Sequence, residues 1–264
     1  MRDSPAQEKE ILQTHIADAV LYITMNHPQK KNALDQKMCA ALCDAIERAD
    51  SDPNIKVVVL RSAIGVFCAG GDIKAMRDRS DIFSGDSREL ALSYRQSIQK
   101  IPLSFASLSK PSIALVAGAA VGAGFDLACM CDFRLATPAA SFSESFASLG
   151  LISGIGGAFH LTRILGLARA TDLALTGRTI QATEALAWGL VNKICQQEDL
   201  ESSCGELVAK LQANSAAALA QTKVLLRQAA LSSLEEHLYL ASTMQGVLQT
   251  DPDHLKRVTQ KLKP

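Results

Sequence analysis

Apolar residues occur along this chain in short runs separated by stretches with helical spacing. Four runs have the composition of buried strands: residues 20–25, 57–60, 113–116 and 133–135. Three stretches have the spacing of helices: residues 35–49, 88–108 and 127–130. In the first of these, Met38, Leu42, Cys43 and Ile46 share one face. Strands that alternate with helices predict an α/β fold with a largely parallel sheet.

The pattern changes in the second half of the chain. After Gly156 the strand signal nearly stops, except at residues 190–194. The remaining apolar spacing is helical, and three helices are predicted over residues 206–212, 216–230 and 234–248. The chain therefore divides into a core domain, residues 1–195, and a helical C-terminal region, residues 196–264.

Two glycine- and alanine-rich turns are the strongest indication of a binding site in the sequence. Residues 67–72 follow the run at 57–60, and residues 118–126 follow the run at 113–116; each turn leads into a predicted helix. Small residues at such a turn leave backbone N–H groups uncovered and free to donate. Two such turns can offer two donors to one oxygen atom, which is what an oxyanion of a thioester enolate requires.

Composition and charge exclude several other classes. The 264 residues are 48% apolar and 20% charged, with 27 basic and 27 acidic side chains, so no nucleic-acid-binding face is indicated. Seven scattered cysteines lack CxxC spacing and nearby paired histidines, which argues against a disulfide framework and against a metal site. Reduced thiols are typical of a cytoplasmic protein.

No targeting or membrane segment is indicated. Residues 1–5 are charged and lack the apolar core of a signal peptide, and Glu8 and Glu10 argue against a transit peptide. No apolar run approaches the roughly 20 residues of a membrane span. We expect a soluble protein without a membrane partner.

An ordered set of motifs over residues 15–195 gives the chain a resemblance to a known family. The segments are 32–34, 67–74, 118–126, 131–134, 149–151, 156–157, 161–166, 175–178 and 185–191. In order and spacing they resemble the crotonase superfamily, the enoyl-CoA hydratase/isomerase family. The resemblance implies a crotonase-like spiral of β-β-α units and a C-terminal region used for trimerisation. It also implies an enzyme that binds acyl-CoA thioesters, with coenzyme A as part of the substrate and no separate cofactor.

The resemblance also implies catalytic positions. The two oxyanion donors fall on the backbone N–H groups of Gly71 and Ala123, and alanine at 123 is compatible with this role if its φ is negative. Asp126 aligns with the first catalytic glutamate of the hydratases. It lies between Phe125 and Leu127, where burial would raise the pKa of its carboxyl toward neutrality. The alternative is a helix-start acid that accepts bonds from backbone N–H groups.

The chain departs from the family at the second acid. The second hydratase glutamate aligns with Phe146, and the acid of some isomerases aligns with Gly154. The nearest carboxyl is Glu144, which we expect to be solvated or paired with a cation. One base and an oxyanion hole suit a double-bond shift at least as well as hydration, and Phe146 would make the site drier.

Substrate contacts are expected at six positions: Ala33, Ala69, Asp72, Ile73, Lys74 and Phe146. Asp72 is also the expected N-cap of a helix over Ile73–Arg77. Lys31 or Lys74 could meet a phosphate of coenzyme A.

Two competing interpretations remain. A dinucleotide-binding oxidoreductase is disfavoured because the glycines at 118, 122 and 124 do not form GxGxxG. A catalytically weak or inactive crotonase-fold protein, which binds acyl-CoA or serves as a scaffold, is favoured by Phe146 and Gly154. The main prediction is enoyl-CoA hydratase/isomerase chemistry on 2-enoyl- or 3-enoyl-CoA by a homotrimer or a dimer of trimers.

Overall fold

Two mostly parallel sheets and the helices packed on them form the body of the protein. The computed structural model describes residues 10–262; the predictions made on residues 1–5 and Glu8 lie outside this range. The six-stranded sheet has the order β1 (Leu12–Ala17), β2 (Val20–Met25), β3 (Val57–Ser62), β5 (Ser112–Val116), β7 (Phe133–Ala136) and β10 (Lys193–Ile194). The four-stranded sheet has the order β4 (Val66–Cys68), β6 (Ala119–Val121), β8 (Ser141–Ser143) and β9 (Thr179–Gln181).

Only the outer pairs β1–β2 and β8–β9 are antiparallel; every other pairing in the two sheets is parallel. The predicted parallel α/β fold is therefore confirmed. The central strand β3 is apolar along residues 57–60 because both of its faces are covered. Val58 and Leu60 face the main core, whereas Val57 and Val59 face a second cluster under α8.

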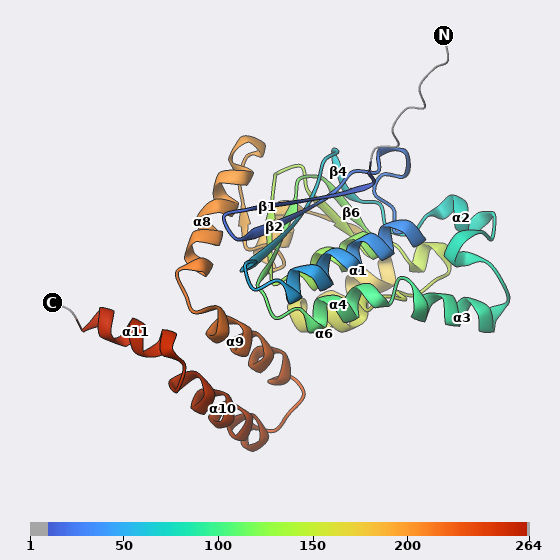
Figure 1. Cartoon of the computed structure of the whole chain (residues 1–264). Coiled ribbons are helices and arrows are strands. Elements are labelled where there is room, and N and C mark those ends of the chain that lie inside the picture. The colour runs from blue at the N-terminus through green and yellow to red at the C-terminus, as the bar shows by residue number, and fades with distance from the viewer. Residues whose placement is uncertain (1–9, 263–264) are drawn as a thin grey trace, which may run out of the picture.

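Eleven α-helices are present in residues 10–262, and Figure 1 shows how they surround the sheets. Their bounds are α1 Gln36–Ser51, α2 Ile73–Arg77, α3 Ser87–Gln96, α4 Lys100–Ser107, α5 Ala123–Met130, α6 Gly157–Thr176, α7 Ala182–Ala187, α8 Leu200–Gln212, α9 Ala216–Gln228, α10 Leu234–Gln249 and α11 Pro252–Lys261. Four short 3₁₀ turns complete the set: η1 Pro28–Lys30, η2 Asp81–Phe83, η3 Ala147–Leu149 and η4 Gln197–Asp199. None of these helices is long and apolar enough to cross a membrane.

The predicted helix over residues 88–108 is wrong in one respect, because it is two helices. α3 ends at Gln96 and α4 begins at Lys100. Pro102 lies in the first turn of α4, where it has no N–H to offer to the carbonyl of residue 98. In Figure 1, α3 lies beyond the end of α4 and below α2.

Each glycine- and alanine-rich segment contains part or all of a short strand that the sequence did not predict. β4 overlaps the start of the first segment, residues 67–72, and β6 lies inside the second, residues 118–126. The chain thus runs strand, short strand, helix in both places, and β4 pairs directly with β6. This pairing brings the two turns to the same edge of the small sheet.

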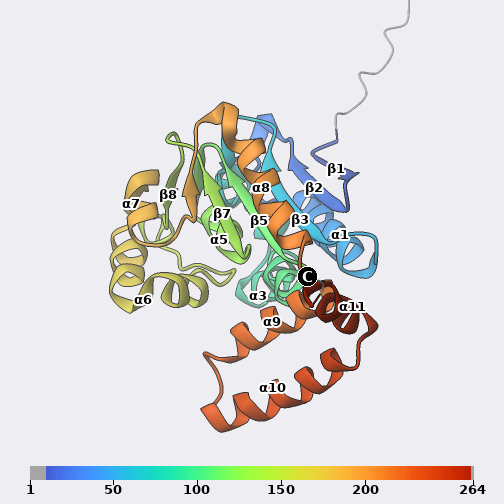
Figure 2. The same ribbon diagram turned by 90° about the vertical axis from the view of Figure 1, so that its left-hand side faces the viewer.

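The C-terminal region has two parts. α8 packs on the outer face of the large sheet through Leu200, Cys204, Val208 and Leu211. The second part is formed by α9, α10 and α11. α9 contacts the body through Lys223, which pairs with Asp132 at 2.6 Å, and α10 lies beyond α9, away from the sheets (Figure 2). The exposed apolar side chains of this part include Leu226, Leu234, Leu238 and Tyr239 on the helices and Leu231 in the turn between α9 and α10.

Candidate active site

The first turn joins β4 to α2 and leaves one backbone donor free. Gly70 has a φ of +87°, a conformation that favours glycine. Asp72 caps α2 by accepting bonds from the N–H groups of Lys74 at 3.0 Å and Ala75 at 3.1 Å, as predicted. The N–H of Gly71 donates to no oxygen among residues 10–262. It is available to a ligand.

Polar contacts of Asn32 and Lys30 hold this turn in place. Asn32 is fully buried, and its side chain donates to Ser62 Oγ at 2.8 Å and to the carbonyl of Phe67 at 3.0 Å. Lys30 bridges the carboxylates of Asp35 at 2.8 Å and Asp72 at 2.9 Å. These contacts fix the turn to the main chain that precedes α1.

The second turn joins β6 to α5 and offers a second donor. Gly122 has a φ of +50°, and its N–H donates to the carbonyl of Ser143 at 2.7 Å. Ala123, the first residue of α5, is absent from the positive-φ residues, so the condition set for alanine at this position is met. Its N–H has no acceptor among the described residues. A methyl group on Gly70 would lie 3.2 Å from Ala123 N, so the two turns are in contact.

Asp126 follows on the first turn of α5, where it is completely buried. Ser153 donates its hydroxyl to Asp126 Oδ2 at 2.6 Å and accepts the N–H of Gly157 at 2.8 Å. No backbone N–H among the described residues donates to this carboxyl, so Asp126 is not the helix-start cap of the alternative interpretation. Burial raises its pKa strongly, and the hydrogen bond from Ser153, together with the neighbouring Glu144 carboxyl, partly opposes that rise.

Glu144 differs from the expectation of a solvated or ion-paired acid: it is buried, and no cation among residues 10–262 pairs with it. Only 2% of its surface is exposed, and it lies beside Asp126. A methyl group on Gly157 would lie 2.2 Å from Glu144 Oε1 and 2.4 Å from Asp126 Oδ1. Glu144 directly follows β8, and its side chain is buried like that of Phe142, two residues earlier. Burial, and then the charge of Asp126, raise its pKa strongly.

The two positions expected to carry a second acid have other roles. The ring of Phe146 lies against Gly122, where an added methyl group would be 3.6 Å from Cζ. Gly154 lies against the ring of Tyr94, and its carbonyl accepts a bond from Gln99 Nε2 at 2.8 Å. Tyr94 and Ser153 carry no signal in the sequence that would have placed them here, and the motif that contains Gly157 does not indicate this role.

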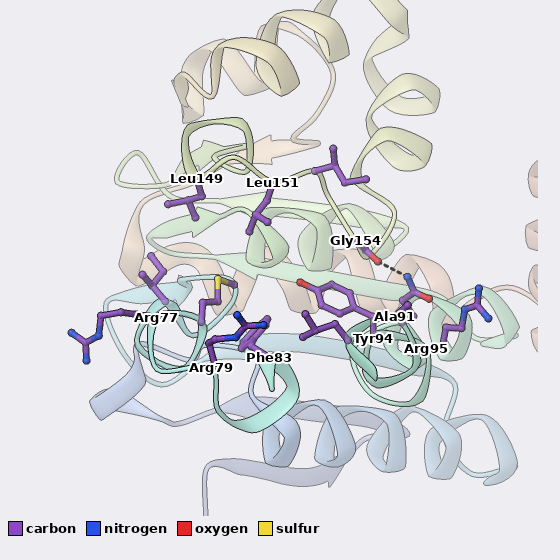
Figure 3. Close-up of a pocket in the computed structure, with 14 residues that line it drawn as sticks. Arg77, Arg79, Phe83, Ala91, Tyr94, Arg95, Leu149, Leu151 and Gly154 are labelled. Atoms are coloured by element: carbon purple, nitrogen blue, oxygen red, sulfur yellow. Dashed lines mark hydrogen bonds between the residues drawn. The ribbon is translucent and has the colours of Figure 1, made fainter. Parts of the chain in front are cut away.

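An apolar cavity of about 880 Å³ lies between α2, α3 and the loop of residues 149–154. Its apolar lining residues are Ile73, Met76, Phe83, Leu90, Ala91, Tyr94, Leu149, Leu151 and Ile152. Figure 3 shows Leu149 and Leu151 above the cavity and Phe83 and Tyr94 below it, with Arg77 and Arg95 pointing away at its two ends.

The cavity meets the first turn but does not include the carboxyl pair. Met76 and Phe83 border both the cavity and Gly71. Asp126 lines no part of the cavity, but Gly154 does. Its neighbour Ser153 is the hydrogen-bond partner of Asp126. The predicted positions Ala33 and Phe146 also lie outside the cavity lining, whereas Ile73 is part of it.

The remaining predicted substrate contacts lie around the first turn. Ala33 is buried below Gly70, whose carbonyl accepts the N–H of Leu34 at 2.7 Å. Ala69 donates its N–H to the carbonyl of Lys31 at 3.0 Å, and Lys74 is exposed on α2. The structure thus gathers Gly71, Ala123 and the first-turn positions in one region.

Known proteins resemble this chain over most of its length. The family profile for enoyl-CoA hydratase/isomerase matches residues 15–262. A Mycobacterium tuberculosis protein named probable enoyl-CoA hydratase echA8 is 36% identical over 218 residues, 82% of this chain and 80% of that protein. The 1,2-epoxyphenylacetyl-CoA isomerase of Escherichia coli is 30% identical over 250 residues, 95% of this chain and 94% of that protein.

Solved structures agree along the whole chain. The enoyl-CoA hydratase of Mycobacterium smegmatis superposes with a TM-score of 0.88 at 30% identity, covering 96% of each chain. A Thermobifida fusca structure in complex with CoA superposes with a TM-score of 0.82 at 29% identity, covering 96% of this chain and 95% of that one. The chain belongs to the enoyl-CoA hydratase/isomerase family and has its crotonase fold.

Proposed function

We propose that this protein shifts the double bond of an enoyl-CoA thioester from C3–C4 to C2–C3. The observation that carries the proposal is the combination of two uncommitted N–H groups, on turns in contact, with one buried base nearby. The relatives are named as enzymes, which gives no support to the inactive alternative.

The N–H groups of Gly71 and Ala123 would bind the thioester oxygen. When a proton leaves C2, this oxygen takes up negative charge, and both donors stabilise it without having to reorient. Losing one donor of this kind typically reduces the rate by roughly 10²–10³. Because both donors are main-chain groups, Ala123 serves as well as glycine at a negative φ.

Asp126 would move the proton. Its carboxylate takes the proton from C2, and the electron pair of that C–H bond forms the C1–C2 double bond of the enolate. The same proton is then delivered to C4, the enolate collapses, and the new double bond lies between C2 and C3. No other reactant is needed, so one base is sufficient.

Hydration of 2-enoyl-CoA is the second candidate. It is favoured by Glu144, a second carboxyl beside Asp126, and by the relatives named as hydratases. It requires a water molecule at C3, however, and the aligned position that would activate it is Phe146. We therefore place isomerisation first.

The substrate contacts and the assembly belong to the same proposal. The apolar cavity would hold the acyl chain. Ala33, Ala69, Asp72, Ile73 and Lys74 would border the coenzyme A portion.

The exposed apolar side chains of α9–α11 support a homotrimer, or a dimer of trimers, built through residues 196–264. Seven free cysteines support a cytoplasmic location.

The test compares turnover of matched 2-enoyl- and 3-enoyl-CoA thioesters by wild type and D126N. We expect interconversion of the two isomers without net uptake of water, and a loss of about 10²–10⁴ in D126N. Formation of 3-hydroxyacyl-CoA as the main product would contradict isomerisation and establish hydration as the reaction. No turnover of any thioester in the panel, together with no exchange of C2 protons in heavy water, would exclude both.

A further inference from the structure

Glu144 and Asp126 form a pair of buried carboxyl groups that cannot both be ionised at little cost. Both side chains border the same face of Gly157, at 2.2 Å and 2.4 Å from an added methyl group. Asp126 Oδ1 and Glu144 Oε2 are buried and receive no hydrogen bond from residues 10–262. Two like charges in such a site would repel without compensation, whereas one proton between them satisfies both groups.

The surroundings decide which carboxyl holds that proton. Asp126 already accepts the hydroxyl of Ser153, whose direction is fixed because its oxygen accepts the N–H of Gly157. This donor stabilises a negative charge on Asp126. Glu144 has no such donor among the described residues. The negative charge therefore belongs on Asp126 and the proton on Glu144.

Neighbouring titratable groups leave this assignment unchanged. Those on β4, α5, β7 and α6 include Cys68, Cys129, Arg134 and His160. Burial raises the pKa of the Cys68 thiol to about 12 and that of Cys129 further, and it lowers the pKa of His160 to about 4, so all three are neutral at pH 7. Arg134 donates to the carbonyls of Leu190, Ala128 and Cys131 and to neither carboxyl.

We propose that Glu144 holds the proton shared by the two carboxyl groups and thereby keeps Asp126 ionised and oriented as the base. Glu144 is then a positioning residue, which acts through Asp126 and does not touch the substrate. Glu144 lies two residues before Phe146, which aligns with the second acid of the hydratases, and its proposed role differs from that of this acid. The inference rests on the proposed role of Asp126 in proton transfer.

The kinetic test uses E144Q and E144A. Glutamine keeps the shape of protonated glutamate and a donor for Asp126, so E144Q should retain kcat/KM at pH 7 within about tenfold of wild type. E144A removes the donor and should lose about a hundredfold. S143A is the matched control, since Ser143 is the preceding buried residue and its hydroxyl bonds only the carbonyl of Gly177.

The pH profile separates positioning from packing. In wild type, kcat/KM should fall at low pH as Asp126 is protonated, and at high pH as Glu144 loses its proton. E144Q should lose the alkaline fall, and E144A should move the acid fall to higher pH. A loss in E144Q as large as in D126N would show that Glu144 itself transfers protons. Unchanged profiles in both variants would show that it only packs. Either result overturns the proposal.

Infrared spectroscopy tests the proton independently of turnover. Protein labelled with ¹³C at glutamate carboxyl groups should show a protonated glutamate carbonyl band at pH 7 that is missing from E144Q. The absence of this band from wild type would refute the proposal even in an active enzyme. Its presence in a protein that turns over no enoyl thioester would refute the proposed reaction and leave the protonated Glu144 standing.

Discussion

The ring of Tyr94 occupies the space beside Gly154, where a methyl group would lie 2.5 Å from Cε1. Gly154 also aligns with the position at which some isomerases of the family carry an acid. The ring of Tyr94 therefore packs where a side chain at position 154 would lie. Both residues form part of the wall of the apolar cavity between α3 and the loop of residues 149–154 (Figure 3).

G154A should therefore destabilise the fold through Tyr94 and not through backbone strain. We expect a decrease of about 1–3 kcal/mol in the free energy of unfolding, measured with urea. In the Y94A background the same substitution should change stability by less than about 0.5 kcal/mol, whereas in Y94F, which keeps the ring, the full effect should return. Equal effects in all three backgrounds would mean that another contact limits position 154.

G70A should separate the two proposed oxyanion donors. A methyl group there would lie 2.5 Å from the carbonyl oxygen of Val121, and the φ of +87° disfavours alanine. We expect kcat to fall by about 10²–10³ and stability by about 1–3 kcal/mol. G65A is the matched control, because a methyl group at Gly65 meets nothing within 4 Å. Similar activities of G70A and G65A would contradict the placement of the hole.

S153A should shift the acid side of the pH–activity profile to higher pH. The Ser153 hydroxyl stabilises the charged form of Asp126, so its loss allows the pKa of Asp126 to rise further. A charge-assisted hydrogen bond of about 1.5–3 kcal/mol corresponds to about one to two pH units. Activity should thus fall more at pH 6 than at pH 8. S148A, which loses only an exposed bond to the carbonyl of Ser145, should leave the profile in place.

E144Q should gain stability relative to wild type as the pH rises. The folded protein holds protons on the carboxyl pair that the unfolded chain releases near pH 4, because burial raises both pKa values. Wild-type stability contributed by the pair is thus complete below about pH 4 and is lost as pH rises through the folded pKa values.

Urea unfolding at pH 5, 6, 7 and 8 measures this difference. For one retained proton, the advantage of E144Q should grow by about 1.4 kcal/mol per pH unit. E198Q, which removes an exposed carboxyl in η4, serves as the reference. A difference between E144Q and wild type that is constant across this range would show that the folded protein retains no extra proton.

Much of the fold followed from the sequence because its strongest signals are local. The apolar run of β3 and the one-sided helix α1 were predicted within a few residues, since burial on both faces or on one face dictates those patterns. The short strands β4 and β6 have three residues each, too few for a period to be seen. The division between α3 and α4 depended on one residue, Pro102, in an otherwise continuous helical pattern.

In the candidate site, too, the residues with local signals were predicted and those that depend on distant contacts were not. Gly71, Ala123 and Asp126 lie in the two segments whose composition stands out, and the family resemblance supplies the individual positions. Glu144 was misjudged because its environment is built by residues distant in the chain, above all Gly157, whose missing side chain leaves the space for both carboxyl groups. A pattern shows that a charged residue follows a strand; it does not show what packs against it.

The position of Ala123 has a consequence for how this enzyme can be studied. The atoms proposed to bind the oxyanion belong to the peptide backbone, and one of them belongs to a residue that is already alanine. A systematic alanine scan would therefore leave half of the proposed hole untouched. Only replacement of the peptide link itself, an ester in place of the amide at residue 123, would remove that donor and leave every side chain as it is.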